Sequence, residues 1–206
     1  LPGVELKFAP IDGESRKLEL RVRGPNVFPG YLGDEAATRA AFDDEGFYRI
    51  GDAGHLADDD DPAQGVVFDG RVAEDFKLTS GTWVSVGTLR LRVVSALAPL
   101  AQDVVITGHE RSEVGVLVFL SEAGRKTPPE ALRERVREAL RALAADSGGA
   151  SSQAPARALV LPDAPSMAAG EITDKGYINQ RLTLQRRAVE VEALYAEPPD
   201  ARSIRA

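Results

Sequence analysis

The sequence predicts an α+β fold in two parts: a β-rich part over residues 1–70 and a compact mixed part over residues 71–206. In the first part, short stretches such as residues 18–23 alternate apolar and charged side chains, which is the pattern of a strand with one buried face. In the second part, apolar residues at helical spacing stand between continuous apolar runs, which indicates helices packed on a buried sheet. The pattern changes near residues 70–77, and we expect the boundary there.

Turn residues separate the elements expected in the first part. Residues 4–8 and 18–23 are predicted strands, with Pro and Gly residues around them. Residues 38–42 predict a short helix, and the acidic turn at residues 43–46 leads from it into a strand at residues 47–50.

Four consecutive Asp residues, 58–61, precede the last strand of this part. Adjacent carboxylates repel one another and cannot all turn toward one ion. The run therefore predicts a solvated loop in preference to a metal site. Residues 66–68 then form a short strand that ends at Gly70.

The second part is expected to contain a roughly three-stranded sheet with flanking helices. Apolar runs predict its strands at residues 104–106, 114–120 and 156–161. Apolar spacing predicts its helices at residues 86–97, from Pro129 onward and at residues 180–195. The helix from Pro129 has the clearest pattern, because four residues share one stripe: Leu132, Val136, Leu140 and Leu143.

Composition narrows the classes of function. The 25 Lys and Arg residues face 32 Asp and Glu residues, and a net charge of −7 gives no basic field for a nucleic acid. No Cys and only two His residues leave no disulfides and little to bind a metal, so we expect no bound metal in this chain and a reducing, cytoplasmic location. The apolar runs are far shorter than the roughly 20 residues that cross a bilayer, so we expect no membrane partner.

Taken alone, few residues of this chain identify a reaction, but three segments stand out. Residues 48–52 end a predicted strand on Asp52 beside a Gly, which can present a carboxylate to a pair of vicinal hydroxyls. Arg71 follows Gly70 at the expected boundary. Near the end of the chain, residues 170–176 hold Lys175 in a Gly-flanked loop that can reach away from its own domain.

In their order, these segments resemble the adenylate-forming superfamily of acyl-CoA synthetases, peptide-synthetase adenylation domains and luciferases. The match extends over nearly the whole chain and is carried by residues 24–27 with 29–31, residues 47–52, Gly70 and Arg71 with Lys77 and Gly81, and Lys175. The details of residues 70–86 and 170–181 are most similar to feruloyl-CoA synthetases and related aromatic acyl-CoA ligases.

The resemblance implies two half-reactions with ATP, Mg²⁺ and CoA as substrates. A carboxylic acid, by resemblance an aromatic, hydroxycinnamate-like one, first forms an acyl-AMP, and the thiol of CoA then displaces AMP. Residues 1–70 would be the C-terminal remnant of a large adenylation domain and residues 71–206 a small mobile domain. The chain opens without Met, so we expect a missing N-terminal domain with the phosphate loop, and an isolated chain without adenylation activity.

The resemblance also implies roles for single residues. Asp52 corresponds to the carboxylate that binds the ribose hydroxyls, although a capping or turn Asp is the structural alternative. Arg71 corresponds to a second ribose or phosphate contact, against the alternative of a surface ion pair. Lys175 corresponds to the mobile lysine that bridges the acyl carboxylate and the α-phosphate, against the alternative of a solvated lysine.

Further positions concern the second half-reaction and the domain movement. Gly81 matches a loop that lines the pantetheine passage, and a turn glycine is the alternative. Trp83 would line the same passage, although an isolated Trp is more often a core residue. The hinge falls on Glu74 by spacing, with Asp75 beside it. Asp174 precedes Lys175 where the superfamily has Gly, and we expect this carboxylate to hold the lysine until substrate arrives.

Two alternatives to an aromatic acyl-CoA synthetase remain open at the level of sequence. One is a ligase for a different acyl or aryl acid. The other is a noncatalytic nucleotide-binding module with the same fold, which would bind nucleotide without exchanging pyrophosphate.

Overall fold

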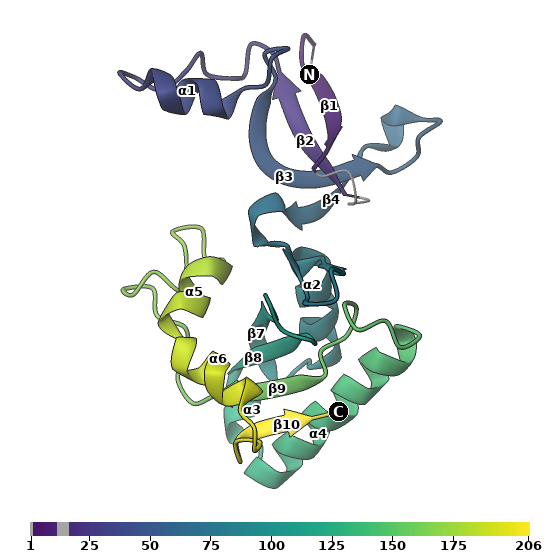
Figure 1. Ribbon diagram of the computed structural model, residues 1–206, viewed down its shortest axis with the longest axis vertical. Coiled ribbons are helices and arrows are strands. Elements are labelled where there is room, and N and C mark those ends of the chain that lie inside the picture. The colour runs from purple at the N-terminus through teal and green to yellow at the C-terminus, as the bar shows by residue number, and fades with distance from the viewer. Residues whose placement is uncertain (1, 12–16) are drawn as a thin grey trace. The chain divides into compact units, whose positions relative to one another are not determined.

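The computed structural model describes residues 2–11 and 17–206, and the chain forms two compact units, Leu1–Ala73 and Glu74–Ala206 (Figure 1). Unit 1 contains one four-stranded antiparallel sheet, and unit 2 contains a four-stranded mixed sheet with helices on both faces. The mixed α+β architecture predicted from the sequence is confirmed.

The sheet of unit 1 has the order β1-β2-β3-β4, with β1 at Glu5–Pro10, β2 at Leu18–Arg23, β3 at Tyr48–Leu56 and β4 at Val66–Arg71. The bounds of β2 are those predicted. Short 3-10 turns follow at Pro62–Gln64 and Val72–Glu74. The Asp58–Asp61 run is an exposed loop, as expected, and the carboxylate of Asp61 accepts a hydrogen bond from the N–H of Ala63.

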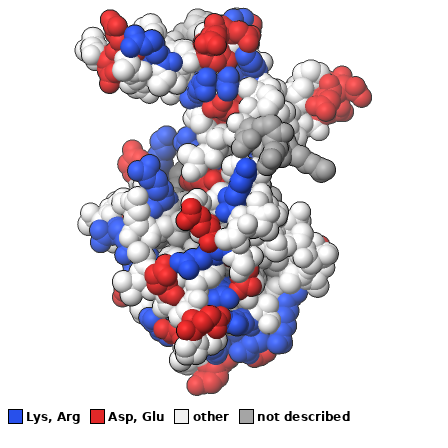
Figure 2. All heavy atoms as spheres, viewed as in Figure 1, with Lys and Arg blue, Asp and Glu red and all other residues white. Residues whose placement is uncertain are grey.

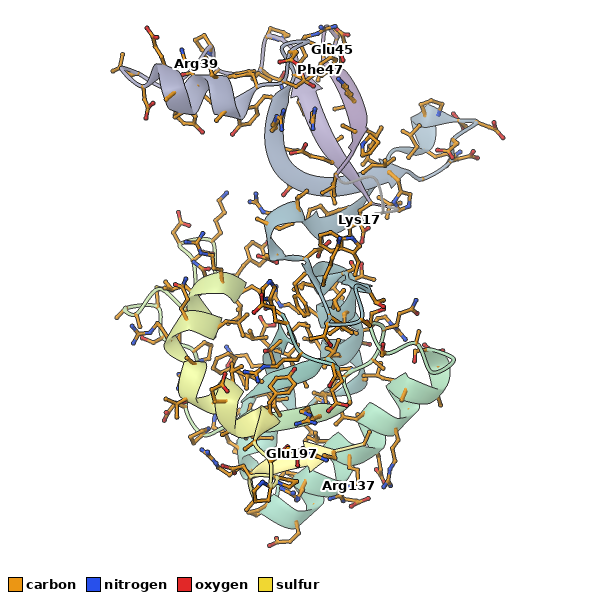
Figure 3. The ribbon with its side chains drawn as sticks, in the orientation of Figure 1. Lys17, Arg39, Glu45, Phe47, Arg137 and Glu197 are labelled. Carbon is orange, nitrogen blue, oxygen red and sulfur yellow. The ribbon has the colours of Figure 1, made fainter. Side chains whose placement is uncertain are left out.

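Helix α1, Glu35–Ala41, begins three residues before the predicted start. The carboxylate of Asp34 accepts a hydrogen bond from the N–H of Ala37 at 2.8 Å, and this cap sets the first turn. The turn after the helix is held by Asp43, which accepts hydrogen bonds from the N–H of Phe47 and from Arg21. Figure 3 shows Phe47 and Glu45 close together at this end of the sheet.

In unit 2 the strand order is β10-β9-β8-β7, with β7 at Ala101–Thr107, β8 at Gly115–Leu120, β9 at Arg157–Leu161 and β10 at Ser203–Arg205. Roughly three strands were expected, and the sheet has a fourth, β10, whose three residues include a single apolar side chain, Ile204, too few to form a pattern. A separate two-stranded ribbon pairs β5, Phe76–Lys77, with β6, Trp83–Val84.

Five helices of unit 2 accompany the sheet: α2 at Val86–Ala96, α3 at Glu122–Lys126, α4 at Pro129–Asp146, α5 at Gln180–Arg186 and α6 at Ala188–Tyr195. The predicted helix at residues 180–195 is therefore two helices. Arg187 separates them with φ −96° and ψ 26°, outside the α-helical range. The apolar spacing continues across the break, so the sequence pattern does not reveal it.

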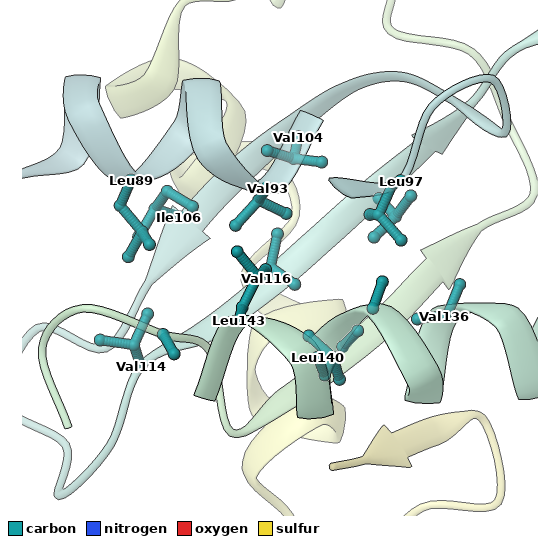
Figure 4. Packing of buried hydrophobic residues seen from close by; sticks show 14 of the residues in the cluster. Leu89, Val93, Leu97, Val104, Ile106, Val114, Val116, Val136, Leu140 and Leu143 are labelled. Atoms are coloured by element: carbon teal, nitrogen blue, oxygen red, sulfur yellow. The ribbon is translucent and has the colours of Figure 1, made fainter. Parts of the chain in front are cut away.

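The sheet of unit 2 is buried on both faces, and its side chains alternate between two clusters. Val116 and Val118 of β8 pack in a cluster with α2 and α4, where Figure 4 shows Val93 and Leu140 meeting the strands. The intervening residues Leu117 and Phe119 pack in a second cluster with Leu194 of α6 and with the loop before α5.

We predict that Leu140→Ala lowers the free energy of unfolding of unit 2 by about 2–5 kcal/mol, because the leucine is fully buried between α4 and the sheet. The matched control is Leu91→Ala in α2, where the leucine is 72% exposed, and we expect a change within about 0.5 kcal/mol. Urea titration followed by the fluorescence of Trp83, the single Trp of the chain, measures both. Equal losses would contradict the packing described.

Candidate functional site

Asp52 lies in β3 between two irregularities of the sheet. The register against β2 shifts between Leu20 and Arg21, and the register against β4 shifts between Asp52 and Gly54. Gly51, immediately before Asp52, has φ +77°, which favours glycine. Bulges of this kind redirect a side chain out of the regular alternation of a strand.

Asp52 and Arg71 face each other in neighbouring strands, and their side chains meet. The Oδ1 of Asp52 lies 3.0 Å from Nε of Arg71, and Nη1 of Arg71 donates a hydrogen bond to the carbonyl of Ile50 at 3.3 Å. The arrangement of the close pair is not that of a hydrogen bond, so this buried carboxylate oxygen has no hydrogen-bond donor among the described residues. The Asp52 side chain as a whole is 28% exposed, so the carboxylate remains partly open to solvent beside its ion pair with Arg71.

Gly81 sits in the tight turn that joins β5 to β6. Its N–H donates to the carbonyl of Leu78 at 2.9 Å, and the N–H of Leu78 donates to the carbonyl of Thr82 at 3.0 Å. The φ of Gly81 is +81°, so the turn itself requires glycine. A Cβ at this position would meet no atom within 4 Å, so the space beside the turn is open.

Trp83 pairs with Lys77 across the ribbon, and the Lys77 ammonium lies 5.0 Å from the centre of the indole ring. The ring is half-buried and belongs to neither hydrophobic cluster, so the alternative of a core Trp does not describe it. Its Nε1 is buried without a hydrogen-bond acceptor among the described residues.

The two candidate hinge residues differ in their attachments. Glu74 is the first residue of unit 2 and the last of a 3-10 turn. Asp75 accepts a hydrogen bond at 2.9 Å from the N–H of Val86, the first residue of α2. Asp75 is thus fastened to the helix within unit 2, and Glu74 stands at the division.

Lys175 occupies the tip of a small hairpin. Ile172 and Ile178 pair as an antiparallel bridge, and the N–H of Thr173 donates to the carbonyl of Tyr177 at 2.8 Å. Gly176, with φ +84°, closes the turn by donating to the carbonyl of Thr173 at 2.9 Å. The lysine side chain is therefore held at an exposed tip by a folded turn.

The ammonium of Lys175 makes no hydrogen bond or ion pair with any residue of the described ranges, 2–11 and 17–206. The structure shows no hydrogen bond or ion pair between Lys175 and Asp174, so the expected hold of this carboxylate on the lysine is not seen, and both side chains are exposed. The cation is available to an external anion.

Sequence reasoning missed the residues that anchor this hairpin. Glu171 precedes it and is almost fully buried, and its carboxylate accepts hydrogen bonds from Arg187 and from the N–H of Ser166. Gln180 follows it and binds both the N–H and the carbonyl of Ile106 in the edge strand β7. Nothing in the sequence distinguishes these two residues from ordinary surface Glu and Gln residues near a loop. Their role as anchors is evident only from their burial in the structure.

The predicted site residues divide between the units: Asp52 and Arg71 lie together in unit 1, and Glu74, Gly81, Trp83 and Lys175 lie in unit 2. Figure 2 shows acidic and basic side chains intermixed on the visible face of unit 2. In the part of the chain that the structure describes, no three His, Asp or Glu side chains gather as metal ligands. None of the described helices combines the length and apolar character needed to cross a membrane.

The sequence is similar to parts of larger curated proteins. A carboxylic acid reductase of Segniliparus rugosus is 26% identical over 196 residues, which cover 94% of this chain and 16% of that protein. A long-chain-fatty-acid–CoA ligase of Thermus thermophilus is 27% identical over 186 residues, 87% of this chain and 32% of the ligase. The chain thus spans less than a third of either relative.

The fold has a counterpart among solved structures. The adenylation domain of the Segniliparus rugosus carboxylic acid reductase, in complex with AMP and a co-purified carboxylic acid, superposes with a TM-score of 0.78 at 23% identity. The match covers 96% of this chain and 32% of that one. The family model of the AMP-binding enzyme C-terminal domain matches residues 77–198, more than half of the chain. The chain therefore belongs to the family of AMP-binding enzyme C-terminal domains, within the adenylate-forming superfamily.

Proposed function

We propose that this chain is the C-terminal part of an AMP-forming acid–CoA ligase whose substrate is an aromatic carboxylic acid. The observation that carries the proposal is the exposed, unpaired ammonium of Lys175 on an anchored hairpin inside the family-matched segment. A fixed cation with no partner of its own can stabilise the charge that develops when a carboxylate attacks a phosphate.

Residues 1–70 are proposed to belong to a larger adenylation domain, and the surface of unit 1 supports this. Among its described apolar side chains only Ala9, Phe47 and Ala53 are buried. Large apolar residues are exposed instead: Leu6, Tyr31, Leu32, Val66, Val67 and Phe68. A four-stranded sheet with so small a core needs a second layer, which the rest of a large domain would provide.

The first half-reaction joins the acid to AMP. An oxygen of the substrate carboxylate attacks the α-phosphorus of ATP, a new P–O bond forms, and the bond to the pyrophosphate leaving group breaks. Asp52 accepts hydrogen bonds from the ribose hydroxyls, and Arg71 contributes a second contact to ribose or phosphate. Lys175 bridges the acyl carboxylate and the α-phosphate, where its charge offsets the added negative charge of the transition state.

The second half-reaction transfers the acyl group to CoA. The thiol sulfur attacks the acyl carbonyl carbon, the thiol proton is lost, and AMP leaves with the electrons of the cleaved C–O bond. The open space beside the Gly81 turn and the half-buried Trp83 support a passage for the pantetheine arm there. Because Lys175 and the Gly81 turn belong to one unit that serves both steps, unit 2 is proposed to rotate about Glu74 between them.

The proposal of an aromatic acid as the substrate rests on the similarity of residues 70–86 and 170–181 to feruloyl-CoA synthetases. A cytoplasmic location is supported by the absence of Cys.

Acid-dependent exchange of pyrophosphate into ATP by the full-length protein tests the function, with hydroxycinnamates, benzoates and long-chain fatty acids as separate arms. Nucleotide binding without exchange would instead identify a noncatalytic module.

A reductase is the second candidate, because the Segniliparus rugosus carboxylic acid reductase aligns with 94% of this chain. Both candidates share the adenylation step and differ in the fate of the acyl group. Incubation of the full-length protein with acid, ATP and CoA yields an acyl-CoA thioester if it is a ligase. Formation of aldehyde with an added reduced nicotinamide, and no thioester with CoA, would favour the reductase.

We predict that Lys175→Ala in the full-length protein lowers acyl-AMP formation by on the order of 10²–10³ and spares thioester formation from supplied acyl-AMP. The loss follows from removal of a charge that acts only in the first half-reaction. Lys126→Ala, which removes another exposed lysine of unit 2, is the control and should leave both rates unchanged. Rapid-quench measurement of each half-reaction checks both variants. Adenylation within a few-fold of normal in Lys175→Ala would remove this lysine from the site.

A second prediction concerns the hinge. Pro fixes φ near about −65° and removes a backbone donor, so Glu74→Pro should trap one orientation of unit 2. We expect one half-reaction to fall at least tenfold more than the other, measured separately in the full-length protein. Unchanged Trp83 fluorescence would show that the ribbon beside the hinge remains folded. Equal losses in both half-reactions would place the hinge elsewhere.

A further inference from the structure

Glu171 is a buried charge at the base of the Lys175 hairpin. Only 1% of the residue is exposed, and Arg187 donates to its two carboxylate oxygens at 2.8 and 3.2 Å. The N–H of Ser166 donates a third hydrogen bond at 2.8 Å. Burial by itself would raise the pKa of Glu171, but the hydrogen bonds from Arg187 and Ser166 and the charge of Arg187 hold that pKa below its usual value.

Arg187 stands at the break between α5 and α6, so its bonds to Glu171 connect the hairpin base with this break. Its guanidinium lies 5.9 Å from the ring centre of Phe119, a residue of the second cluster. Glu190 and Asp163 also approach Nη1, at 3.5 and 3.8 Å, but these carboxylates are more exposed than Glu171. The charge pair thus links the hairpin base to the sheet face and to the helix break.

The far end of the hairpin is fixed independently. The N–H of Asn179 donates to the carbonyl of Glu171 at 2.9 Å, which joins the two ends of the loop. The next residue, Gln180, accepts from the N–H of Ile106 at 3.2 Å and donates to its carbonyl. The far end of the loop is therefore attached to β7 through Gln180 and to the near end through Asn179, and Lys175 lies four residues beyond Glu171.

Stability alone gives little reason for such a pair. Removing a carboxylate and a guanidinium from water costs several kcal/mol per ion, and well-packed apolar residues are often as stable in the same place. Apolar residues, however, would not fix the relative orientation of the two side chains. A bidentate contact does fix it, because the guanidinium can meet both carboxylate oxygens in only one orientation.

We propose that Glu171 and Arg187 form a positioning pair that holds the Lys175 hairpin in the geometry required for acyl-AMP formation. The inference rests on the proposed role of Lys175, but it also makes a claim about the hairpin that holds without catalysis. Without the pair, Lys175 keeps its charge and loses its position, and displacement of about 1 Å can lower a rate by on the order of 10².

The first measurement needs no activity. In the full-length protein without substrates, Glu171→Gln should speed hydrogen exchange at least tenfold at the amides of Thr173 and Gly176, which the folded hairpin protects. Glu190→Gln is the matched control: it removes the same charge facing the same guanidinium, at a site that does not touch the loop base, and should leave these amides unchanged. Unchanged exchange in Glu171→Gln would overturn the proposal whatever the enzyme does.

The second measurement uses the full-length protein. Glu171→Gln should lower acyl-AMP formation about 10- to 100-fold and leave thioester formation from supplied acyl-AMP within a few-fold of normal. The double variant with Lys175→Ala should be no slower than Lys175→Ala alone, because a hairpin without its lysine has nothing left to position. Additive losses, or equal losses in both half-reactions, would show a general effect on stability and overturn the proposal.

Arg187→Lys covers the case in which Glu171→Gln does not fold. It keeps the charge and loses the two-pronged contact, so it should show the same selective loss to a smaller extent. Wild-type kinetics in a folded Arg187→Lys would overturn the proposal. If Lys175→Ala itself leaves adenylation unchanged, the proposed function fails, and the exchange experiment still decides whether the pair holds the hairpin.

Discussion

The organisation of unit 2 depends on one strand that is apolar on both faces. Every residue of β8 up to Phe119 is buried, and alternate side chains enter two different clusters. Because both faces must be covered, α2 and α4 are required on one side, and α5, α6 and the hairpin base on the other. Removing either layer would expose a full row of apolar side chains on the sheet. The hairpin base belongs to the second of these layers, whereas the tip of the hairpin, with Lys175, is exposed.

Because the hairpin base is buried and its tip is exposed, buried polar side chains are found at the base, at Glu171 and Gln180. Ile172 and Ile178 bring the hairpin base onto the second cluster, and the backbone of an irregular segment then needs hydrogen-bond partners away from water. Glu171 provides an acceptor for the N–H of Ser166, and Gln180 occupies both backbone groups of Ile106 at the open edge of β7. The same side chains that satisfy buried backbone therefore also limit the positions available to Lys175.

Features of the fold that depend on residues close in sequence could be predicted, whereas features that depend on distant contacts could not. The bounds of β2, the stripe of α4 and the exposed Asp run were predictable because each depends on neighbours close in sequence. The fourth strand and the break at Arg187 were not, since three residues give no periodicity and the break coincides with a charged partner 16 residues away. In the site, Lys175 could be singled out only through resemblance, and its anchors have no local signature at all.

Two carboxylates, one in each unit, differ in how their buried oxygens are satisfied. In unit 1, the carboxylate of Asp52 has a buried oxygen lacking a hydrogen-bond donor among the described residues, although a guanidinium lies 3.0 Å away. In unit 2, the buried carboxylate of Glu171 accepts three hydrogen bonds, and both of its oxygens have a donor. An unsatisfied buried acceptor is costly unless a ligand supplies the donor, whereas a satisfied one serves to fix geometry. This difference agrees with the roles proposed above, in which Asp52 binds a ligand and Glu171 positions the Lys175 hairpin within unit 2.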